Sequence, residues 1–253
     1  QILDPETGTA ISKRINDWLA EKIEAHPDRF VGLATIAPQN PIEAANELER
    51  AVRQLGMRGA VVNSHTKGEY LDQKKFWPIL ETAEKLDVPI YIHPRSPSPA
   101  MIEPYTTYPE LVSAMHGFAA ETSLHAMRLI VSGVFDAYPN LKIILGHLGE
   151  AIPFWLWRID NRFALLGGGK KMRKTPSQYF LDNFVVTTSG NYSLPPFLCT
   201  YMGLGAERIL FAVDYPFQAN WEATPFLDNL EINPDDKAKI AYKNAERLFR
   251  IKS

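Results

Sequence analysis

Six short runs of apolar residues are spaced along the chain, and segments with a helical repeat separate them. The runs are rich in Val, Ile and Leu and are nearly continuous, which is typical of parallel strands buried on both faces. They cover residues 30–36, 59–63, 89–93, 141–147, 184–188 and 209–214. We therefore expect a strand in each of these six places.

Between the runs, apolar residues recur every three or four positions, as in amphipathic helices. The clearest case covers residues 41–55, where Asn40 can cap the first turn and Gly56 ends the helix. Similar patterns predict helices over residues 76–86, 124–134 and 234–249. Strands that alternate with helices imply a parallel α/β fold, and both a doubly wound sheet and a (β/α)₈ barrel fit the pattern.

The composition argues against a nucleic-acid-binding protein, a membrane-spanning protein and a disulfide-rich protein. The 253 residues carry a net charge of −2, so the chain has no basic excess with which to bind nucleic acid. No apolar stretch is long enough to predict a membrane span. The single cysteine, Cys199, excludes an internal disulfide framework and favours a reducing compartment such as the cytoplasm. With no repeat and no long linker, residues 1–253 are predicted to form one domain, with residues 167–174 as a surface loop.

Polar residues end three of the predicted strands. His93 ends the third strand, His147 the fourth and Asp214 the sixth. In a parallel barrel the active site lies at the carboxyl ends of the strands, so these side chains are predicted to share one rim. Imidazole nitrogen and carboxylate oxygen are ligands for zinc or manganese. The pattern favours a metal-dependent site over three separate structural residues.

Other polar residues have two interpretations each. Glu150 follows His147 by three positions, so it can orient that imidazole or simply stabilise a helix start. Arg158 can bind a substrate carboxylate or form an ion pair with Asp160 or another acid. His65 follows the second strand and is a candidate for lining the pocket, whereas a surface or packed role is expected for His125.

Three segments resemble the metal-dependent aromatic acid decarboxylases of the amidohydrolase superfamily. They are Tyr-Ile-His-Pro-Arg at 91–95, Ile-Leu-Gly-His-Leu-Gly-Glu at 144–150 and Phe-Ala-Val-Asp-Tyr-Pro at 211–216. That group includes γ-resorcylate, 5-carboxyvanillate and aminocarboxymuconate-semialdehyde decarboxylases. The similarity runs over nearly the whole chain, and residues 63–72 look most like the 5-carboxyvanillate branch.

The resemblance implies a distorted (β/α)₈ barrel that holds one divalent metal ion, zinc or manganese. It implies that His93 and Asp214 are metal ligands and that His147 is a catalytic histidine oriented by Glu150. It also implies that Arg158 binds the substrate carboxylate. Members of the family usually form dimers or tetramers, so a homo-oligomer is expected.

One part of the family pattern is not found. The family's first strand carries a Glu-x-His or His-x-His pair that supplies two further ligands, and nothing before His26 has that form. A closed barrel has eight strands, whereas six are predicted here. We therefore expect that a segment with the first two strands is missing from the given sequence.

The predicted function is non-oxidative decarboxylation of a hydroxylated aromatic acid. The metal would chelate the phenolic and carboxylate oxygens, and protonated Asp214 would donate a proton to the ring carbon that carries the carboxylate. One alternative is a metal-dependent hydrolase of an ester, lactone or amide, in which Asp214 would activate water. A second alternative is a barrel that binds without catalysis. A small aromatic acid is the expected partner.

Overall fold

The computed structural model describes residues 4–167 and 172–251. Within these ranges the chain forms two compact units, one ending at Lys142 and the other beginning at Ile143. The predicted loop at 167–174 falls partly on residues 168–171, which lie outside the described residues. In the described part of the chain, no helix is both long and apolar enough to cross a membrane.

The first unit contains the first three predicted strands as a parallel sheet. They are β1 (Ala34–Thr35), β2 (Ala60–Asn63) and β3 (Ile90–His93), each shorter than the apolar run that predicted it. β2 pairs in parallel with both neighbours, and Asn63 lies opposite His93 in the register. The last residues of β2 and β3 therefore reach the same level at the carboxyl edge of this sheet.

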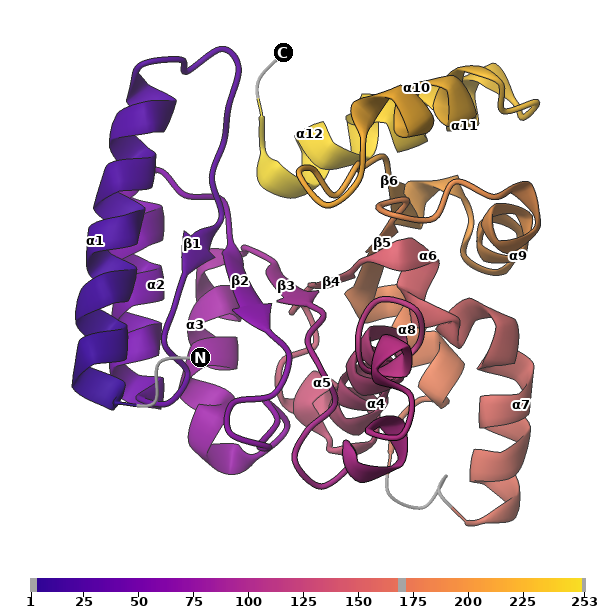
Figure 1. The fold of residues 1–253 in the computed structure, drawn as a ribbon, viewed down its shortest axis with the longest axis horizontal. Coiled ribbons are helices and arrows are strands. Elements are labelled where there is room, and N and C mark those ends of the chain that lie inside the picture. Colours follow the sequence, from indigo (N-terminus) through magenta and orange to yellow (C-terminus); the bar gives the residue numbers. More distant parts are fainter. Residues whose placement is uncertain (1–3, 168–171, 252–253) are drawn as a thin grey trace. The chain divides into compact units, whose positions relative to one another are not determined.

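Helices flank this sheet along the chain (Figure 1). The predicted helix at 41–55 is confirmed as α2 (Pro41–Leu55), with Asn40 capping Glu43 N and Gly56 at a φ of 72°. The prediction at 76–86 is confirmed as α3 (Trp77–Leu86), which a short 3₁₀ turn, η1 (Lys74–Phe76), precedes. The prediction at 124–134 corresponds to α4 (Gly117–Val131) and the start of α5 (Val134–Ala137). Two further 3₁₀ turns are η2 (Glu103–Tyr105) and η3 (Pro109–Val112).

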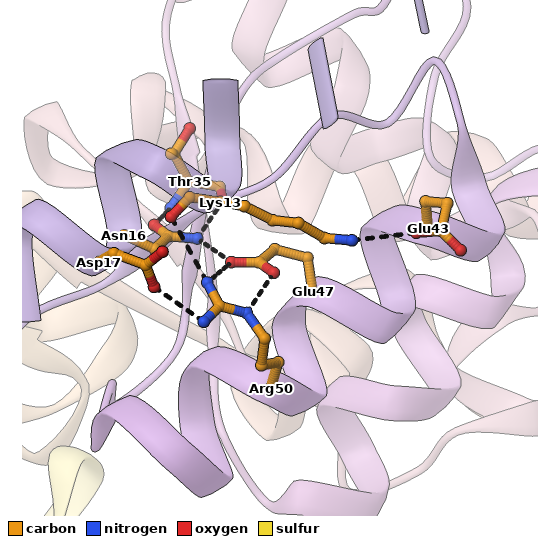
Figure 2. Close-up of polar contacts among 7 residues, drawn as sticks. All are labelled: Lys13, Asn16, Asp17, Thr35, Glu43, Glu47 and Arg50. Carbon is orange, nitrogen blue, oxygen red and sulfur yellow. Dashed lines mark hydrogen bonds and ion pairs between the residues drawn. The ribbon is translucent and has the colours of Figure 1, made fainter. Parts of the chain in front are cut away.

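The pattern did not predict the first helix, α1 (Pro5–Glu24), which runs beside α2 in Figure 1. A polar network holds it in place (Figure 2). The buried side chain of Asn16 donates a hydrogen bond to Thr35 O and accepts one from Thr35 N, both at 2.9 Å. It also donates to Glu47 on α2 at 2.7 Å, and Arg50 pairs with Glu47 at 2.8 Å. The side-chain amide of Asn16 therefore anchors α1 to β1, because it pairs with the Thr35 backbone as the peptide group of an adjacent strand would.

The second unit contains the other three strands, β4 (Ile143–Leu145), β5 (Phe184–Thr187) and β6 (Ile209–Leu210). β5 pairs in parallel with both β4 and β6, as predicted for apolar runs of this kind. Their Phe, Val, Ile and Leu side chains are mostly fully buried. These strands form the centre of the second hydrophobic core.

The helices of the second unit are α6 (His147–Glu150), α7 (Ile152–Leu165), α8 (Pro176–Asn183), α9 (Leu194–Leu204) and α10 (Asn220–Asp228), with a 3₁₀ turn, η5 (Ala206–Arg208). The predicted helix at 234–249 is confirmed, but a π-helical turn divides it. It consists of α11 (Pro234–Ala238), η6 (Lys239–Lys243) and α12 (Asn244–Phe249). The Asn233 side chain accepts from Asp235 N at its start, as the sequence indicates.

Candidate active site

A strained turn after β4 places the first two site residues. His147, Leu148, Glu150 and Ala151 all have a positive φ, between 50° and 63°, and Gly149 between them has a φ of 82°. Non-glycine residues in this conformation cost free energy and concentrate at functional sites. The turn directs the Glu150 side chain back toward the imidazole of His147.

The two side chains form a short hydrogen bond. His147 Nδ1 lies 2.7 Å from Glu150 Oε1, and Glu150 is buried. Because a carboxylate accepts, Nδ1 carries the proton and Nε2 is directed elsewhere. Burial lowers the pKa of His147, but the hydrogen bond and charge of Glu150, together with the charge of Asp214, raise it by more, so the pKa lies above its ordinary value. This hydrogen bond fixes which edge of the His147 ring points toward Glu150.

Asp214 lies in the turn that follows β6. Its φ is 76°, and its carbonyl accepts hydrogen bonds from Phe217 N and Gln218 N at 2.8 and 3.0 Å. Asp214 Oδ2 is 3.6 Å from His147 Nε2. The structure thus brings together three residues that the sequence predicts for the site: His147, Glu150 and Asp214.

Gly190 forms one side of this cluster. It has a φ of 63°, and a Cβ atom there would lie 3.0 Å from His147 Cδ2 and 3.7 Å from Asp214 Oδ2. Tyr192, two residues later, donates its hydroxyl hydrogen to Val213 O, next to Asp214. The sequence pattern did not reveal either residue, because only the folded turns bring them to the cluster.

Arg158 lies on α7 in the same unit and is exposed. The interpretation that it pairs with Asp160 is wrong. Asp160 instead accepts hydrogen bonds from the Ser177 backbone N and hydroxyl, at 2.9 and 2.5 Å. In the described part of the chain the Arg158 side chain forms no hydrogen bond or ion pair, so its guanidinium is available to an anionic ligand.

His93 belongs to the first unit and ends β3. Its Nδ1 lies 2.9 Å from Pro94 O, so Nδ1 donates its proton and Nε2 keeps its lone pair. That tautomer suits metal ligation through Nε2. Among residues 4–167 and 172–251, no three His, Cys, Asp or Glu side chains form a cluster that could hold a metal ion.

The one Glu-x-His sequence of the chain, Glu24-Ala25-His26, is not the strand-borne pair that the family resemblance implies. It lies at the carboxyl end of α1 rather than on a strand, and all three residues are exposed.

His65 is buried in the first unit, and both of its ring nitrogens bond to backbone. Nδ1 accepts from Gly68 N at 3.0 Å, and Nε2 donates to Ser96 O at 3.3 Å. Burial, together with the charge of Arg95, lowers its pKa, which keeps the ring neutral. His65 thus connects two loops and offers no spare ring nitrogen. Direct contact with a substrate stays a prediction.

Comparison with known proteins identifies the family. The family model described as amidohydrolase matches residues 1–251. This chain belongs to the amidohydrolase family. A γ-resorcylate decarboxylase from Polaromonas sp. (strain JS666 / ATCC BAA-500) is 41% identical over 261 residues, which cover 99% of this chain and 79% of that relative.

Solved structures of similar chains have the same fold. A 5-carboxyvanillate decarboxylase from Sphingomonas paucimobilis is 45% identical with a TM-score of 0.94, covering 98% of this chain and 75% of that one. A dihydroxybenzoic acid decarboxylase from Polaromonas sp. JS666, with bound manganese and the inhibitor 2-nitroresorcinol, is 40% identical with a TM-score of 0.94. It matches 99% of this chain and 78% of its own. The predicted barrel fold and the predicted resemblance are confirmed.

Proposed function

We propose that the chain is a metal-dependent carboxy-lyase that removes the carboxylate of a hydroxylated aromatic acid. The observation that carries this proposal is the cluster of Glu150, His147 and Asp214, in which one carboxylate orients an imidazole whose other nitrogen faces a second carboxylate. Relatives that are about 40% identical over nearly the whole chain are decarboxylases of such acids, which supports the same chemistry.

His93 and Asp214 are proposed to hold one divalent ion, zinc or manganese. The chemistry of each donor suits such an ion, because His93 has the tautomer that leaves Nε2 free to ligate and Asp214 offers a carboxylate oxygen. Solved relatives with bound manganese support the assignment. When bound, such an ion supplies a Lewis acid that polarises the phenolic and carboxylate oxygens of the substrate.

The side chains of the protein then have distinct roles. Protonated Asp214 donates its proton to the ring carbon that bears the carboxylate. The carbon–carbon bond breaks next, its electron pair restores the aromatic ring, and carbon dioxide leaves. His147, held by Glu150, hydrogen-bonds the substrate hydroxyl, while Arg158 binds the carboxylate. His65 is proposed to line the site with its ring carbons, because its nitrogens already bond to backbone.

The experiment that tests the proposal measures carbon dioxide release from a panel of hydroxylated benzoates, including 2,6-dihydroxybenzoate and 5-carboxyvanillate, with Mn²⁺ or Zn²⁺ added. We expect one carbon dioxide per acid consumed and no turnover by Asp214→Asn with an unchanged fold. A metal-dependent hydrolase would cleave esters or lactones and release no carbon dioxide. Full activity of Asp214→Asn would remove Asp214 from the mechanism.

We also propose that the protein forms a homo-oligomer in the cytoplasm. Large apolar side chains on α7 are solvent-exposed, with Phe154 at 75% and Trp157 at 77%, which favours burial against another subunit. The lone Cys199 suits a reducing compartment. Sedimentation of the purified protein tests the oligomer, and cell fractionation tests the location.

A further inference from the structure

The first unit contains a buried carboxylate that the proposed chemistry does not use. Glu121 lies on α4 and has no exposed surface. It accepts three hydrogen bonds: from Ser64 Oγ to Oε1 at 3.2 Å, from the Tyr70 hydroxyl to Oε2 at 3.0 Å, and from Ser98 N to Oε2 at 3.1 Å. A carboxylate withdrawn from water is costly unless such donors surround it.

The donors come from two separate segments. Ser64 and Tyr70 bound a tight hairpin that follows β2, in which Thr66 and Glu69 exchange two backbone hydrogen bonds. Ser98 belongs to the segment that follows β3 and His93. Because β2 and β3 end in the same register, both segments leave the carboxyl edge of the sheet, where barrel enzymes place their active sites. Glu121 therefore bonds to both segments at once.

Other bonds join the same two segments. His65 Nε2 donates to Ser96 O at 3.3 Å, and Arg95 Nη1 donates to His65 O at 3.0 Å. The segment after β3 then lines an apolar pocket of about 560 Å³, bounded by Ala100, Met101, Pro104, Tyr105, Leu111 and His116. The Ser98 amide that Glu121 holds lies two residues before this lining begins.

A neighbour on α4 fixes the orientation of the Ser64 hydroxyl. His125 is fully buried, one helical turn after Glu121. Its Nε2 accepts from Leu71 N at 3.1 Å, so the proton is on Nδ1 and is donated to Ser64 Oγ at 3.2 Å. The Ser64 hydroxyl then points its own hydrogen at Glu121. With both nitrogens used, this group of serine, histidine and glutamate is structural and not a hydrolytic triad.

We propose that Glu121 is a positioning residue that fixes the 64–70 hairpin and the 94–98 segment in the arrangement that binds the aromatic acid. An apolar side chain of similar size would fill the same space without the desolvation cost of a charge. What the carboxylate adds is three directed bonds that select one arrangement of two loops. The link to substrate rests on the proposed function, whereas the link to loop order does not.

Hydrogen exchange tests the loop claim without any activity assay. In Glu121→Leu the Ser98 amide loses its acceptor, and we expect it to exchange at least about tenfold faster. Glu121→Gln keeps one acceptor oxygen and should stay within about threefold of the wild type. Tyr70→Phe, which removes one bond and fills the same space, should loosen the hairpin if Glu121→Leu does not fold.

The matched control is Glu47→Leu. Glu47 is also a buried, hydrogen-bonded glutamate in this unit, but its partners are Asn16 and Arg50. The Glu47→Leu variant should be less stable than the wild type, but its Ser98 amide should not exchange faster. Unchanged exchange at Ser98 in Glu121→Leu, or equal acceleration in Glu47→Leu, would overturn the positioning role.

Kinetics tests the link to substrate. Glu121→Leu should raise KM for the acid that the wild type decarboxylates by about tenfold, with kcat within about threefold, and Glu121→Gln should restore KM. Faster exchange with unchanged KM would overturn the substrate link. If the wild type decarboxylates no aromatic acid, the proposed function and with it the substrate link fail, while the exchange result still decides the loop claim.

Discussion

Replacing Glu150 by Gln tests the account of His147 most finely. Glutamine keeps the size of the side chain and an oxygen that can accept a hydrogen bond from Nδ1–H, so the tautomer of His147 is preserved. Only the negative charge beside the imidazole is lost. The 2.7 Å contact is then a neutral hydrogen bond instead of a charge-assisted one.

The size of the effect follows from that difference. Hydrogen bonds to charged groups contribute about 1.5–3 kcal/mol and neutral ones about 0.5–1.5 kcal/mol, so the loss is about 1–1.5 kcal/mol. If the bond acts in the transition state, kcat/KM for decarboxylation should fall by about 5- to 12-fold. Glu150→Ala leaves Nδ1 without this acceptor and the ring free to turn, so it should lower kcat/KM by about 10- to 100-fold.

The assay is initial-rate carbon dioxide release over a range of substrate concentrations. Asp236→Asn is the control, because it makes the same carboxylate-to-amide change in the same unit but contacts Tyr201 and Lys239 instead of His147. Wild-type kcat/KM in a folded Glu150→Gln would refute the orienting role. A loss as complete as that of Asp214→Asn would show that Glu150 takes part in the reaction directly.

Three further predictions concern neighbouring features. Gly190→Ala should lower kcat about tenfold, because the new Cβ atom would push on His147. Gly56→Ala, with a similar φ of 72° but open space around it, should lower stability without changing kcat. Steady-state kinetics measures the effect on kcat, and urea unfolding measures the effect on stability. Arg158→Ala should raise KM about tenfold. Arg158→Lys should restore little of the lost affinity, because lysine cannot form a bidentate contact with a carboxylate. Arg162→Ala, on the same helix, should leave KM unchanged. His125 should make stability pH-dependent, because burial lowers its pKa to about 3 from 6.5. As the pH drops below 6.5, this histidine takes up a proton in the unfolded chain but not in the folded one. The free energy of unfolding therefore falls. Between pH 6.5 and 5 this amounts to roughly 2 kcal/mol, which His125→Gln should remove from urea unfolding measured at the two pH values.

Equal kcat values for the Gly190 and Gly56 variants would mean that the Cβ atom does not disturb His147. A KM for Arg158→Ala like that of the wild type would exclude the carboxylate contact. The same loss of stability at pH 5 in His125→Gln and in the wild type would mean that other groups cause it.

The strands were predictable because their apolar runs are continuous and rich in β-branched residues. His147 and Asp214 were recognisable as candidates for a related reason, since a polar residue directly after a buried strand is conspicuous. α2 was recognisable from its cap and its Gly56 stop. These signals are local, so they survive in a single sequence.

Other features depend on contacts that no local pattern contains. The buried residues of α1 are Gly8, Thr9, Ser12 and Asn16, whereas Leu19 and Ile23 are only partly buried against the core, so its buried face carries a weak hydrophobic signal. Glu121 and His125 look like ordinary helix residues until Ser64, Tyr70 and Ser98 arrive from distant positions. The positive φ angles from His147 to Ala151 are likewise set by the fold and not by residue preference.

The central claim is that the protein protonates an aromatic ring carbon and releases carbon dioxide. The most direct measurement incubates the metal-loaded protein with a ¹³C-carboxyl-labelled dihydroxybenzoate in D₂O and follows both products by NMR and mass spectrometry. We expect labelled carbon dioxide and a phenol with one deuterium at the carbon that carried the carboxylate, in equal amounts. Unlabelled carbon dioxide, or a phenol without deuterium at that carbon, would contradict it.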